Sequence, residues 1–367
     1  MQRSLNTPLP AKVSSRHHGL PLLLVACLAL TPPGIIAQTP RAPAKARATA
    51  DPVVVDERTD AIIKAGLRFL AHKQNPNGSW ADSEEELRHP IAITGYTLMG
   101  FLSAGQLPNE GEFGRTVTAA VDYLLDSTAP DGVMGNREDG QYMYGHGVAA
   151  TSLAEVYGQS RSPTIRAKLD RIIKLIIASQ NAEGGWRYRP VARDADISVT
   201  VLQVVALRAA KNAGLNVPQT TIDNAVKYVK SCFHPATGGF TYQPNREPGF
   251  ARTAAALYSL QVCGLYDDEM VKRGSEYLLK YNREREQWFT YGNFYAAPAQ
   301  YMVGGETWQK WYTQLKEVLL NNVSTKNDFA WWEPKLDHGR AVGVVYCTAV
   351  YTMILAMPYH YIPLYQR

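Results

Sequence analysis

The stretch Gln180-Asn181-Ala182-Glu183-Gly184-Gly185-Trp186 separates an amphipathic segment from an apolar one, and related turns recur along the 367-residue chain. Successive turns lie about 53 residues apart: Asn77-Gly78-Ser79-Trp80, Asp131-Gly132-Val133-Met134 and Thr237-Gly238-Gly239-Phe240. Two degenerate copies follow at shorter spacing, around Trp288 and Trp331. Self-similarity at a fixed period is the mark of a repeat architecture, so the chain is predicted to consist of about six copies of one helical unit.

The segments on the two sides of each turn differ in hydrophobic pattern. The preceding segment, as at residues 61–73, mixes apolar and charged residues at helical spacing, which predicts a helix with one wet face. The following segment is apolar nearly all round and must be buried on every side; examples are residues 91–104, 147–157, 199–210, 253–263 and 342–357. The pattern predicts an all-α (α/α)6 barrel, or toroid, of two concentric rings.

The domain organisation follows from the limits of this pattern. A single toroid domain is expected over residues 56–367, with residues 358–367 as an extended tail across the barrel. Residues 38–55, rich in Pro, Ala, Lys and Arg at their start, are expected to form a disordered tether. No strand of useful length is expected.

The first 37 residues have the pattern of an export signal. Positive residues precede an apolar stretch at residues 20–30, and Ile35-Ile36-Ala37 offers a small-residue cleavage site. The protein is therefore expected to be exported, either to a periplasm or to the outside. Residues 24–27 also resemble a lipobox, in which Cys27 would carry a lipid, and a retained anchor is a third alternative.

Charge and cysteine content exclude several classes of protein. Removal of the leader takes away three basic side chains, so the net charge of +5 falls to about +2, and no dense Lys/Arg block marks a nucleic-acid site. Cys232, Cys263 and Cys347 remain, an odd number without close spacing, and free thiols are expected.

Two turns carry a family resemblance. Phe69-Leu70-x-x-x-Gln74-x-x-x-Gly78-x-Trp80 and Ile177-x-x-Gln180-x-x-x-Gly184-Gly185-Trp186 resemble the QW repeat of triterpene cyclases. The stretch from Gly184 to Asp194-Ala195-Asp196-Ile197-Ser198 is similar to the squalene–hopene cyclase segment in which GGW precedes Asp-x-Asp-Asp-Thr. The likeness to the prenyltransferase and squalene-oxidase repeat superfamily covers nearly the whole chain after the leader and implies the toroid fold.

The resemblance also implies catalytic residues. Asp196 matches the cyclase proton donor, and Asp194 matches the carboxylate that helps to polarise it. Ile197 and Ser198 replace the third Asp and the Thr of the motif, and the chain supplies one barrel where triterpene cyclases use two. A simpler interpretation is that both aspartates cap the following helix or face solvent.

Further candidate residues lie at the expected starts of inner helices. Arg252, His338, Arg340 and His146 are predicted to contribute to a binding site at one end of the barrel axis, together with Asp194 and Asp196. Trp186 is included as a substrate-binding candidate. The alternative for the turn aromatics, Trp80, Trp186, Phe240, Trp288 and Trp331, is a structural role as plugs between neighbouring hairpins. For His146 and His338 the alternative is a cap or a structural hydrogen bond.

Two other enzyme classes remain open. Protein prenyltransferases bind zinc through Asp-x-Cys and a later His, and the corresponding positions here read Asp194, Asp196 and Cys347, an unusual ligand set. Glycosidases of (α/α)6 type use two carboxylates across a cleft. The partners of Asp196 in that case would be Glu155, Glu247 or Asp337.

The sequence favours a binding function at the mouth of the barrel. The leading hypothesis is an exported toroid that binds an apolar or isoprenoid ligand, or a protein partner, with no metal or other cofactor; peripheral contact with a membrane is left open. The rival hypothesis is a class II terpene-cyclase-like enzyme with Asp196 as the general acid and Asp194 as its helper.

Overall fold

The computed structural model describes residues 53–366, except 136, 139, 282–287 and 338–341. The chain separates into two units, Met1–Ala48 and Thr49–Arg367, and the helices and strands described all lie in the second unit. The predicted leader, with Cys27, and residues 38–52 of the predicted tether lie outside the described residues. Val53, at the end of that tether, is buried against the core.

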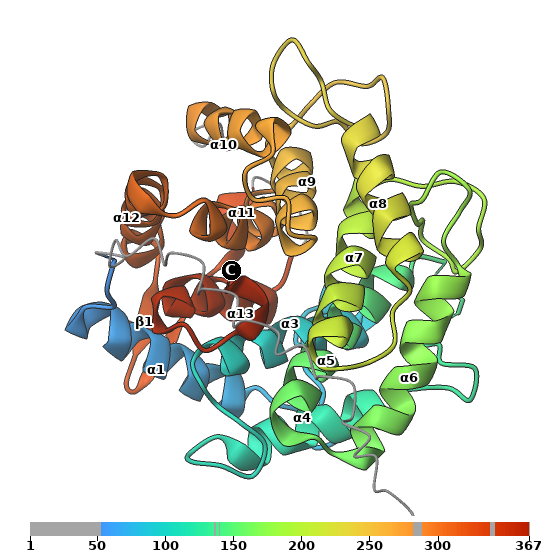
Figure 1. Ribbon diagram of the computed structural model, residues 1–367. Helices are drawn as coiled ribbons and strands as arrows, with labels where there is room; N and C mark the ends of the chain where they lie inside the picture. Colours follow the sequence, from blue (N-terminus) through green and yellow to red (C-terminus); the bar gives the residue numbers. More distant parts are fainter. Residues whose placement is uncertain (1–52, 136, 139, 282–287, 338–341, 367) are drawn as a thin grey trace, which may run out of the picture. The chain divides into compact units, whose positions relative to one another are not determined.

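In the described part of the chain, twelve longer helices form the toroid. Figure 1 shows their arrangement in two rings. The inner ring consists of α3 (Pro90–Ser103), α5 (Met143–Ser160), α7 (Ile197–Asn212), α9 (Phe250–Val262), α11 (Phe289–Val303) and α13 (Val344–Ala356). The outer ring consists of α1 (Glu57–His72), α4 (Gly114–Asp126), α6 (Pro163–Ala178), α8 (Gln219–Ser231), α10 (Glu269–Tyr281) and α12 (Gly305–Asn321). The predicted (α/α)6 toroid is confirmed.

The inner ring is closed. Each inner helix packs against the next one along the chain, and α13 packs against α3, so the last repeat meets the first. Each inner helix follows its outer partner, so all six begin at the same end of the barrel, which we call the rim. Side chains that precede or open the inner helices therefore lie at this end.

Burial explains the two kinds of helix. Every residue of α13 from Val345 to Ala356 is buried, because this helix has neighbours on all sides. In α10 the buried residues recur at helical spacing and the rest of the surface is wet. An amphipathic outer helix buries its apolar face and solvates the other one, as the sequence pattern predicts.

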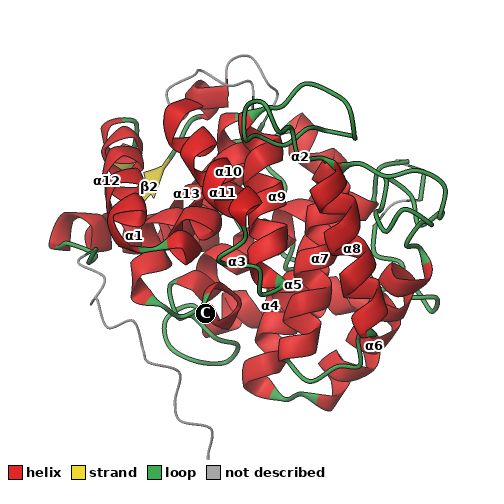
Figure 2. Cartoon of the chain, turned by 45° about the horizontal axis from the view of Figure 1, so that its top comes forward, coloured by secondary structure: helices red, strands yellow, loops and turns green. Residues whose placement is uncertain are grey.

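A few short elements complete the unit. These are the helix α2 (Glu84–Arg88), the strands β1 (Ser324–Lys326) and β2 (Phe329–Trp331), and the 3-10 turns η1 (Pro334–Asp337), η2 (Met357–Tyr359) and η3 (Pro363–Tyr365). The antiparallel pair β1–β2 was not predicted, because three-residue strands have no readable alternation. It is the only sheet among the described residues, and Figure 2 shows β2 beside an otherwise helical body.

The recurring glycines have a common backbone conformation. Gly78, Gly132, Gly184 and Gly238 have φ between +82° and +99°. A Cβ on Gly184 would lie 2.1 Å from the carbonyl oxygen of Asn224 in the next outer helix. The turn therefore needs glycine both for its left-handed backbone and for the close approach of the neighbouring hairpin.

The turn aromatics make one repeated contact. A threonine hydroxyl in the inner helix accepts a hydrogen bond from the aromatic residue's backbone N–H in four repeats: Thr94 with Trp80, Thr200 with Trp186, Thr253 with Phe240, and Thr348 with Trp332. The aromatic of the last repeat is therefore Trp332. The assignment of Trp331 to this role was wrong by one residue, because two adjacent tryptophans leave the register ambiguous.

The end of the barrel opposite the rim is filled by the C-terminal tail. The predicted extended tail contains the two 3-10 turns η2 and η3, and its Leu364 and Tyr365 are buried. Tyr365 contacts Tyr258 of α9, and its hydroxyl donates to the sulfur of Met353. Glu155 of α5 accepts a hydrogen bond from the backbone of Leu364. The tail thus closes the axis at this end.

Cys232, Cys263 and Cys347 are free, as expected. Cys232 and Cys263 end α8 and α9 respectively. Within the described part of the chain, no helix combines the length and the apolar character that crossing a membrane requires.

Candidate functional site

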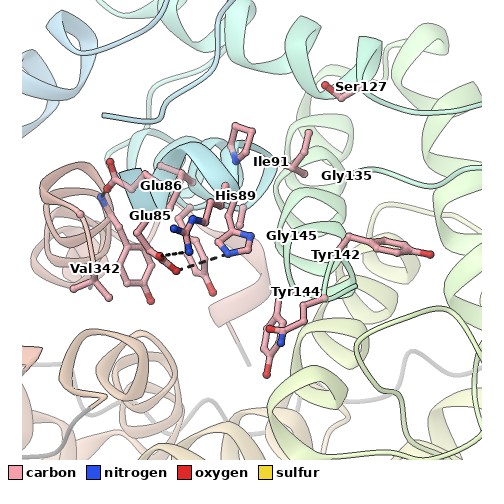
Figure 3. Close-up of a pocket in the computed structure, with 18 of the residues that line it drawn as sticks. Glu85, Glu86, His89, Ile91, Ser127, Gly135, Tyr142, Tyr144, Gly145 and Val342 are labelled. Atoms are coloured by element: carbon pink, nitrogen blue, oxygen red, sulfur yellow. Dashed lines mark hydrogen bonds and ion pairs between the residues drawn. The ribbon is translucent and has the colours of Figure 1, made fainter. Parts of the chain in front are cut away.

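A cavity of about 610 Å³ opens at the rim. Its wall comes from the starts of α3, α5 and α13, from the end of α4, from Trp288 before α11, and from α2. The wall is mainly apolar and aromatic, with Pro90, Ile91, Ala92, Ile93, Val342 and the rings of Tyr96, Tyr123, Tyr142, Tyr144, Tyr346 and Trp288. Figure 3 shows Tyr144 and Val342 on different sides of this space.

Among the described residues, the charged groups of the wall lie on a single segment, α2 and the residue that follows it. Glu85 Oε2 lies 3.6 Å from Arg88 Nη1, and Glu85 Oε1 lies 3.9 Å from His89 Nε2. Arg88 also pairs with Glu84 at 3.0 Å. The ion pairs of Arg88 are exposed and lie at the entrance, and Figure 3 shows Glu85 beside His89.

Glu86 holds this segment in place. Its side chain is buried, and Oε2 accepts from the backbone N–H of Asp82 and Ser83 at 3.0 and 3.3 Å. Oε1 accepts from the backbone N–H of Tyr346, in the first turn of α13, at 2.9 Å. A carboxylate at a helix N-terminus satisfies free N–H groups and the helix dipole. Glu86 thus ties the first repeat to the last across the closure of the ring.

The aromatic wall is packed edge to face. The ring of Tyr96 meets Phe294 at 4.7 Å and Tyr346 at 5.0 Å, both near perpendicular. Burial raises the pKa of Tyr96 to about 12 and raises that of Tyr346 as well, so both phenols are neutral at physiological pH. The wall therefore presents uncharged rings with polar hydroxyl tips.

Asp196 is the N-cap of α7. Its fully buried carboxylate accepts from the backbone N–H of Val199 at 3.0 Å and from the hydroxyl of Ser198 at 2.6 Å. Its other oxygen lies 3.1 Å from Arg187 Nε. Burial raises the pKa of Asp196, while these hydrogen bonds and Arg187 act in the opposite direction. These contacts of Asp196 are those of a helix N-cap.

Asp194 lies in a different environment. Its side chain is 62% exposed and pairs with Arg187 Nη1 at 2.7 Å. The Arg187 guanidinium joins the two aspartates and lies over the ring of Tyr188 at 4.7 Å. Neither aspartate is among the residues that line the cavity.

Asp196 nevertheless reaches the cavity through two side chains. The hydroxyl of Ser198, which contacts Asp196, lies 2.7 Å from the hydroxyl of Tyr144, and Tyr144 lines the cavity. The hydroxyl of Tyr291 donates to the Ser198 carbonyl at 3.1 Å. Burial raises the pKa of Tyr144, and the nearby Asp196 adds to this effect.

His146 and Trp186 lie within the packing between helices. His146 Nδ1 accepts from the Met134 backbone N–H at 3.3 Å, which is the place that threonine takes in other repeats. Trp186 donates from Nε1 to the Ile176 carbonyl at 2.7 Å. Both side chains are buried, and neither lines the cavity. Their surroundings match the structural alternatives given for them.

Three other residues were predicted to lie at the rim. Arg252, in the first turn of α9, donates to the Glu247 carbonyl at 2.8 Å and does not line the cavity. His338 and Arg340 lie outside the described residues. The predicted convergence of these three side chains with the two aspartates therefore stays a prediction.

The zinc and glycosidase alternatives gain no support from the positions of their candidate residues. No three His, Cys, Asp or Glu side chains gather to hold a metal in the described ranges. Cys347 instead contacts the hydroxyl of Thr290 at 3.7 Å. Asp337 caps α11 through the Thr290 backbone at 2.9 Å, and Glu155 lies at the end occupied by the tail.

The segment from Glu84 to Pro90 was not singled out in the sequence. The available signal was three consecutive acidic residues followed by Arg88-His89-Pro90, directly before an apolar helix. Ser83 and Glu86 make a capping box, which marks the start of α2. That pattern predicts a short helix but does not indicate that its residues face a cavity.

Comparison with known proteins agrees with the fold. Residues 37–190 and 149–294 match the prenyltransferase alpha-alpha toroid domain. Drimenyl diphosphate synthase from Streptomyces showdoensis is 26% identical over 194 residues, which are 52% of this chain and 34% of that enzyme. The chain thus spans about a third of the length of this relative.

Similar folds occur in enzymes with different activities. Cellobiose 2-epimerase from Bacillus thermoamylovorans aligns with a TM-score of 0.63 at 11% identity, over 83% of this chain and 99% of that one. The GH76A α-1,6-mannanase of Salegentibacter gives 0.62 at 6% identity, over 82% and 99%. The type II terpene cyclase MstE from Scytonema gives 0.54 at 13% identity, over 83% and 98%. These likenesses show the fold alone, and the sequence match shows that the chain belongs to the prenyltransferase alpha-alpha toroid family.

Proposed function

We propose that this protein binds a small, largely apolar molecule of the isoprenoid class in the rim cavity. The observation that carries the proposal is the cavity itself, about 610 Å³, whose described wall consists mainly of tyrosines, one tryptophan and aliphatic side chains, with charged groups on one segment. Ligand pockets of roughly 300–1,000 Å³ with apolar walls and a few polar groups hold drug-sized molecules. Because the tail fills the other end of the axis, the rim is the entrance.

Family membership supports the choice of ligand class. The name of the Streptomyces relative identifies an isoprenoid diphosphate as its product, and MstE was solved with geranylgeranyl dihydroxybenzoate. The epimerase and mannanase neighbours share only the fold with this chain, so a sugar ligand is the outcome against which the proposal is tested. A protein partner at the rim is a further outcome to be tested.

A binding assay with a blocked cavity tests the proposal. We expect isoprenoids of roughly 15 to 20 carbons to bind, because the cavity volume is in the range of pockets that hold drug-sized ligands. Oligosaccharides should not bind. Ala92→Phe places a ring in the cavity wall and should abolish binding. The control variant Ala61→Phe makes the same change at an exposed position of α1 and should leave binding intact. The isoprenoid assignment would be refuted if cellobiose or mannotriose bound to the chain and only Ala92→Phe abolished that binding.

A second candidate function is acid-initiated cyclisation with Asp196 as the proton source. The observation that favours it is the hydrogen-bonded path from Asp196 through Ser198 to Tyr144 at the cavity wall. Asp196→Asn retains the N-cap and should abolish any cyclic product, whereas Asp194→Asn, on the exposed side of Arg187, should reduce it less. Product formation that survives Asp196→Asn would exclude this role.

Export is a separate part of the proposal and depends on the first 37 residues. Expression of the full chain, followed by fractionation and N-terminal sequencing, should give a chain that begins near residue 38. Lipid attached to Cys27 would instead establish the lipoprotein alternative.

A further inference from the structure

The deep end of the rim cavity meets a layer of aromatic rings. Tyr96 lines the cavity and lies about 9 Å further along α3 than Pro90, which lines it at the start of the helix. The ring of Tyr96 meets Phe294 of α11 edge to face at 4.7 Å, and Phe294 meets Tyr295 at 4.9 Å. All three rings are buried. The cavity therefore ends against a layer that α3 and α11 build together.

A second, smaller void lies on the other side of this layer. It measures about 10 Å³, and Phe294 lines it. Met99 of α3 and Val148 of α5 also line it, each three residues beyond a residue that lines the rim cavity. Three residues of a helix advance by about 4.5 Å, so the void lies roughly one turn deeper along the axis. It has about the smallest volume that holds one water molecule, so no organic ligand fits it as it stands.

The C-terminal tail bounds this void. Tyr365 lines it, and the ring of Tyr365 lies 6.2 Å from that of Tyr258. The order along the axis is thus the rim cavity, the layer of Tyr96 and Phe294, the void, and Tyr365. Tyr96 faces the upper space and Phe294 lines the lower one, so Phe294 is the side chain that stands between them.

The charged segment at the entrance orients a ligand with one polar end. Glu85 and Arg88 form an exposed ion pair there, and a polar group that stays at the entrance keeps its contact with water. The hydrocarbon part of the ligand then points toward Tyr96. Burial of each additional carbon raises affinity about fourfold, and this gain stops where the chain meets the ring layer.

Resting on the proposed function, we infer that Phe294 sets the maximum length of the isoprenoid chain that the site accepts. A chain longer than the cavity has to leave its last carbons in water or displace the ring. A smaller side chain at position 294 joins the rim cavity to the void and lengthens the site along the axis. This assigns a specificity-determining role to a residue of α11.

A series of linear isoprenoid alcohols tests the inference: geraniol, farnesol, geranylgeraniol and geranylfarnesol, each one isoprene unit longer than the last and each titrated into the full chain by calorimetry. Wild-type affinity should rise at least about tenfold per unit up to one member of the series and then stop rising. Phe294→Ala should move this limit to the next member, whose affinity should exceed the wild-type value by at least about tenfold, the effect of burying two more carbons. A wild-type affinity that rises through the whole series would overturn the inference.

Two further variants control for a general loosening of the core. Phe101→Ala removes an equally buried ring of α3 that packs on Trp80 and Phe113 and lines neither space, so it should leave the limit where it is. Phe294→Leu keeps an apolar side chain and should favour the same longer alcohol as Phe294→Ala, by a smaller factor. A limit that neither substitution at Phe294 moves would overturn the inference.

Tyr365→Ala tests the order of the layers. This change enlarges the void below Phe294, so alone it should not alter the length limit, whereas combined with Phe294→Ala it should extend the limit further. A shift caused by Tyr365→Ala alone would contradict the inferred order. If no alcohol of the series binds the wild-type chain, the proposed function itself fails; if the alcohols bind with a limit that ignores Phe294, only the inference fails.

Discussion

Glu86→Ala should weaken the closure of the ring. The carboxylate is 2% exposed and accepts three backbone N–H bonds, of which one comes from Tyr346 in the last repeat. Alanine removes all three acceptors. The N–H groups of Asp82 and Ser83 lie in a partly exposed loop and can bond to water, whereas the N–H of Tyr346 stays buried.

The expected cost follows from these contacts. A buried N–H left without a partner costs about 1–3 kcal/mol, and the loss of an N-terminal cap costs about 1 kcal/mol. Release of a buried charge offsets part of this cost. The free energy of unfolding should therefore fall by about 2–4 kcal/mol.

The assay is urea unfolding of the purified chain, followed by circular dichroism. Glu84→Ala is the matched control, since Glu84 lies on the same short helix but its side chain is 89% exposed, and it should change the unfolding free energy by less than about 0.5 kcal/mol. Equal effects of the two substitutions would refute the argument that Glu86 closes the ring.

A double-mutant cycle sharpens this test. A Cβ on Gly343 would lie 1.9 Å from the carboxyl group of Glu86, so Gly343→Ala must displace that side chain. In the Glu86→Ala background the same change should cost less, because the obstructing carboxylate is gone. Additive effects would mean that the two residues do not contact each other as described.

Three other expectations can be measured on the same material. Burial lowers the pKa of His146 to about 4, so on acidification the imidazole takes up a proton in the unfolded chain before it does so in the folded one. The free energy of unfolding should therefore fall by about 3 kcal/mol from pH 7 to pH 4 through this residue. His146→Thr should remove this part of the pH dependence. Burial raises the pKa of Glu155 to about 7, so its stabilising contribution is complete below pH 4.5 and is lost as pH rises through 7; Glu155→Gln should therefore raise stability at pH 8 but not at pH 4. Gly184→Ala should lower the free energy of unfolding, measured in urea, by several kcal/mol. Gly264→Ala should cost less, about 1–2 kcal/mol for positive φ alone. Both glycines have positive φ, but only Gly184 has a backbone carbonyl within contact distance.

The repeat could be predicted because its determinants are local. A positive-φ glycine, an aromatic residue and the change from amphipathic to apolar helix are all visible within one unit. Nothing in the sequence fixes the register where two tryptophans adjoin. Trp332, rather than Trp331, donates from Nε1 to the Leu319 carbonyl and completes the repeat, and Trp331 instead stacks on Phe69.

The candidate site was less predictable. Asp196 stood out because it opens an apolar helix, and its capping bond to Val199 follows from that position. The cavity depends on which inner helices begin side by side after the ring closes, and closure brings residues 85–93 against residues 342–346. A contact across 260 positions leaves no local pattern, so Glu85 and His89 had no signal beyond their charge.

The central claim is that the ligand enters the rim cavity between α2, α3, α5 and α13. Photo-crosslinking with a diazirine analogue of farnesol, followed by peptide mass spectrometry, tests it directly. Labels should fall on peptides that contain residues 85–96, 141–145 and 342–346, and Ala92→Phe should abolish them. Labels confined to residues 187–196 or to the outer helices, and unaffected by Ala92→Phe, would contradict the claim.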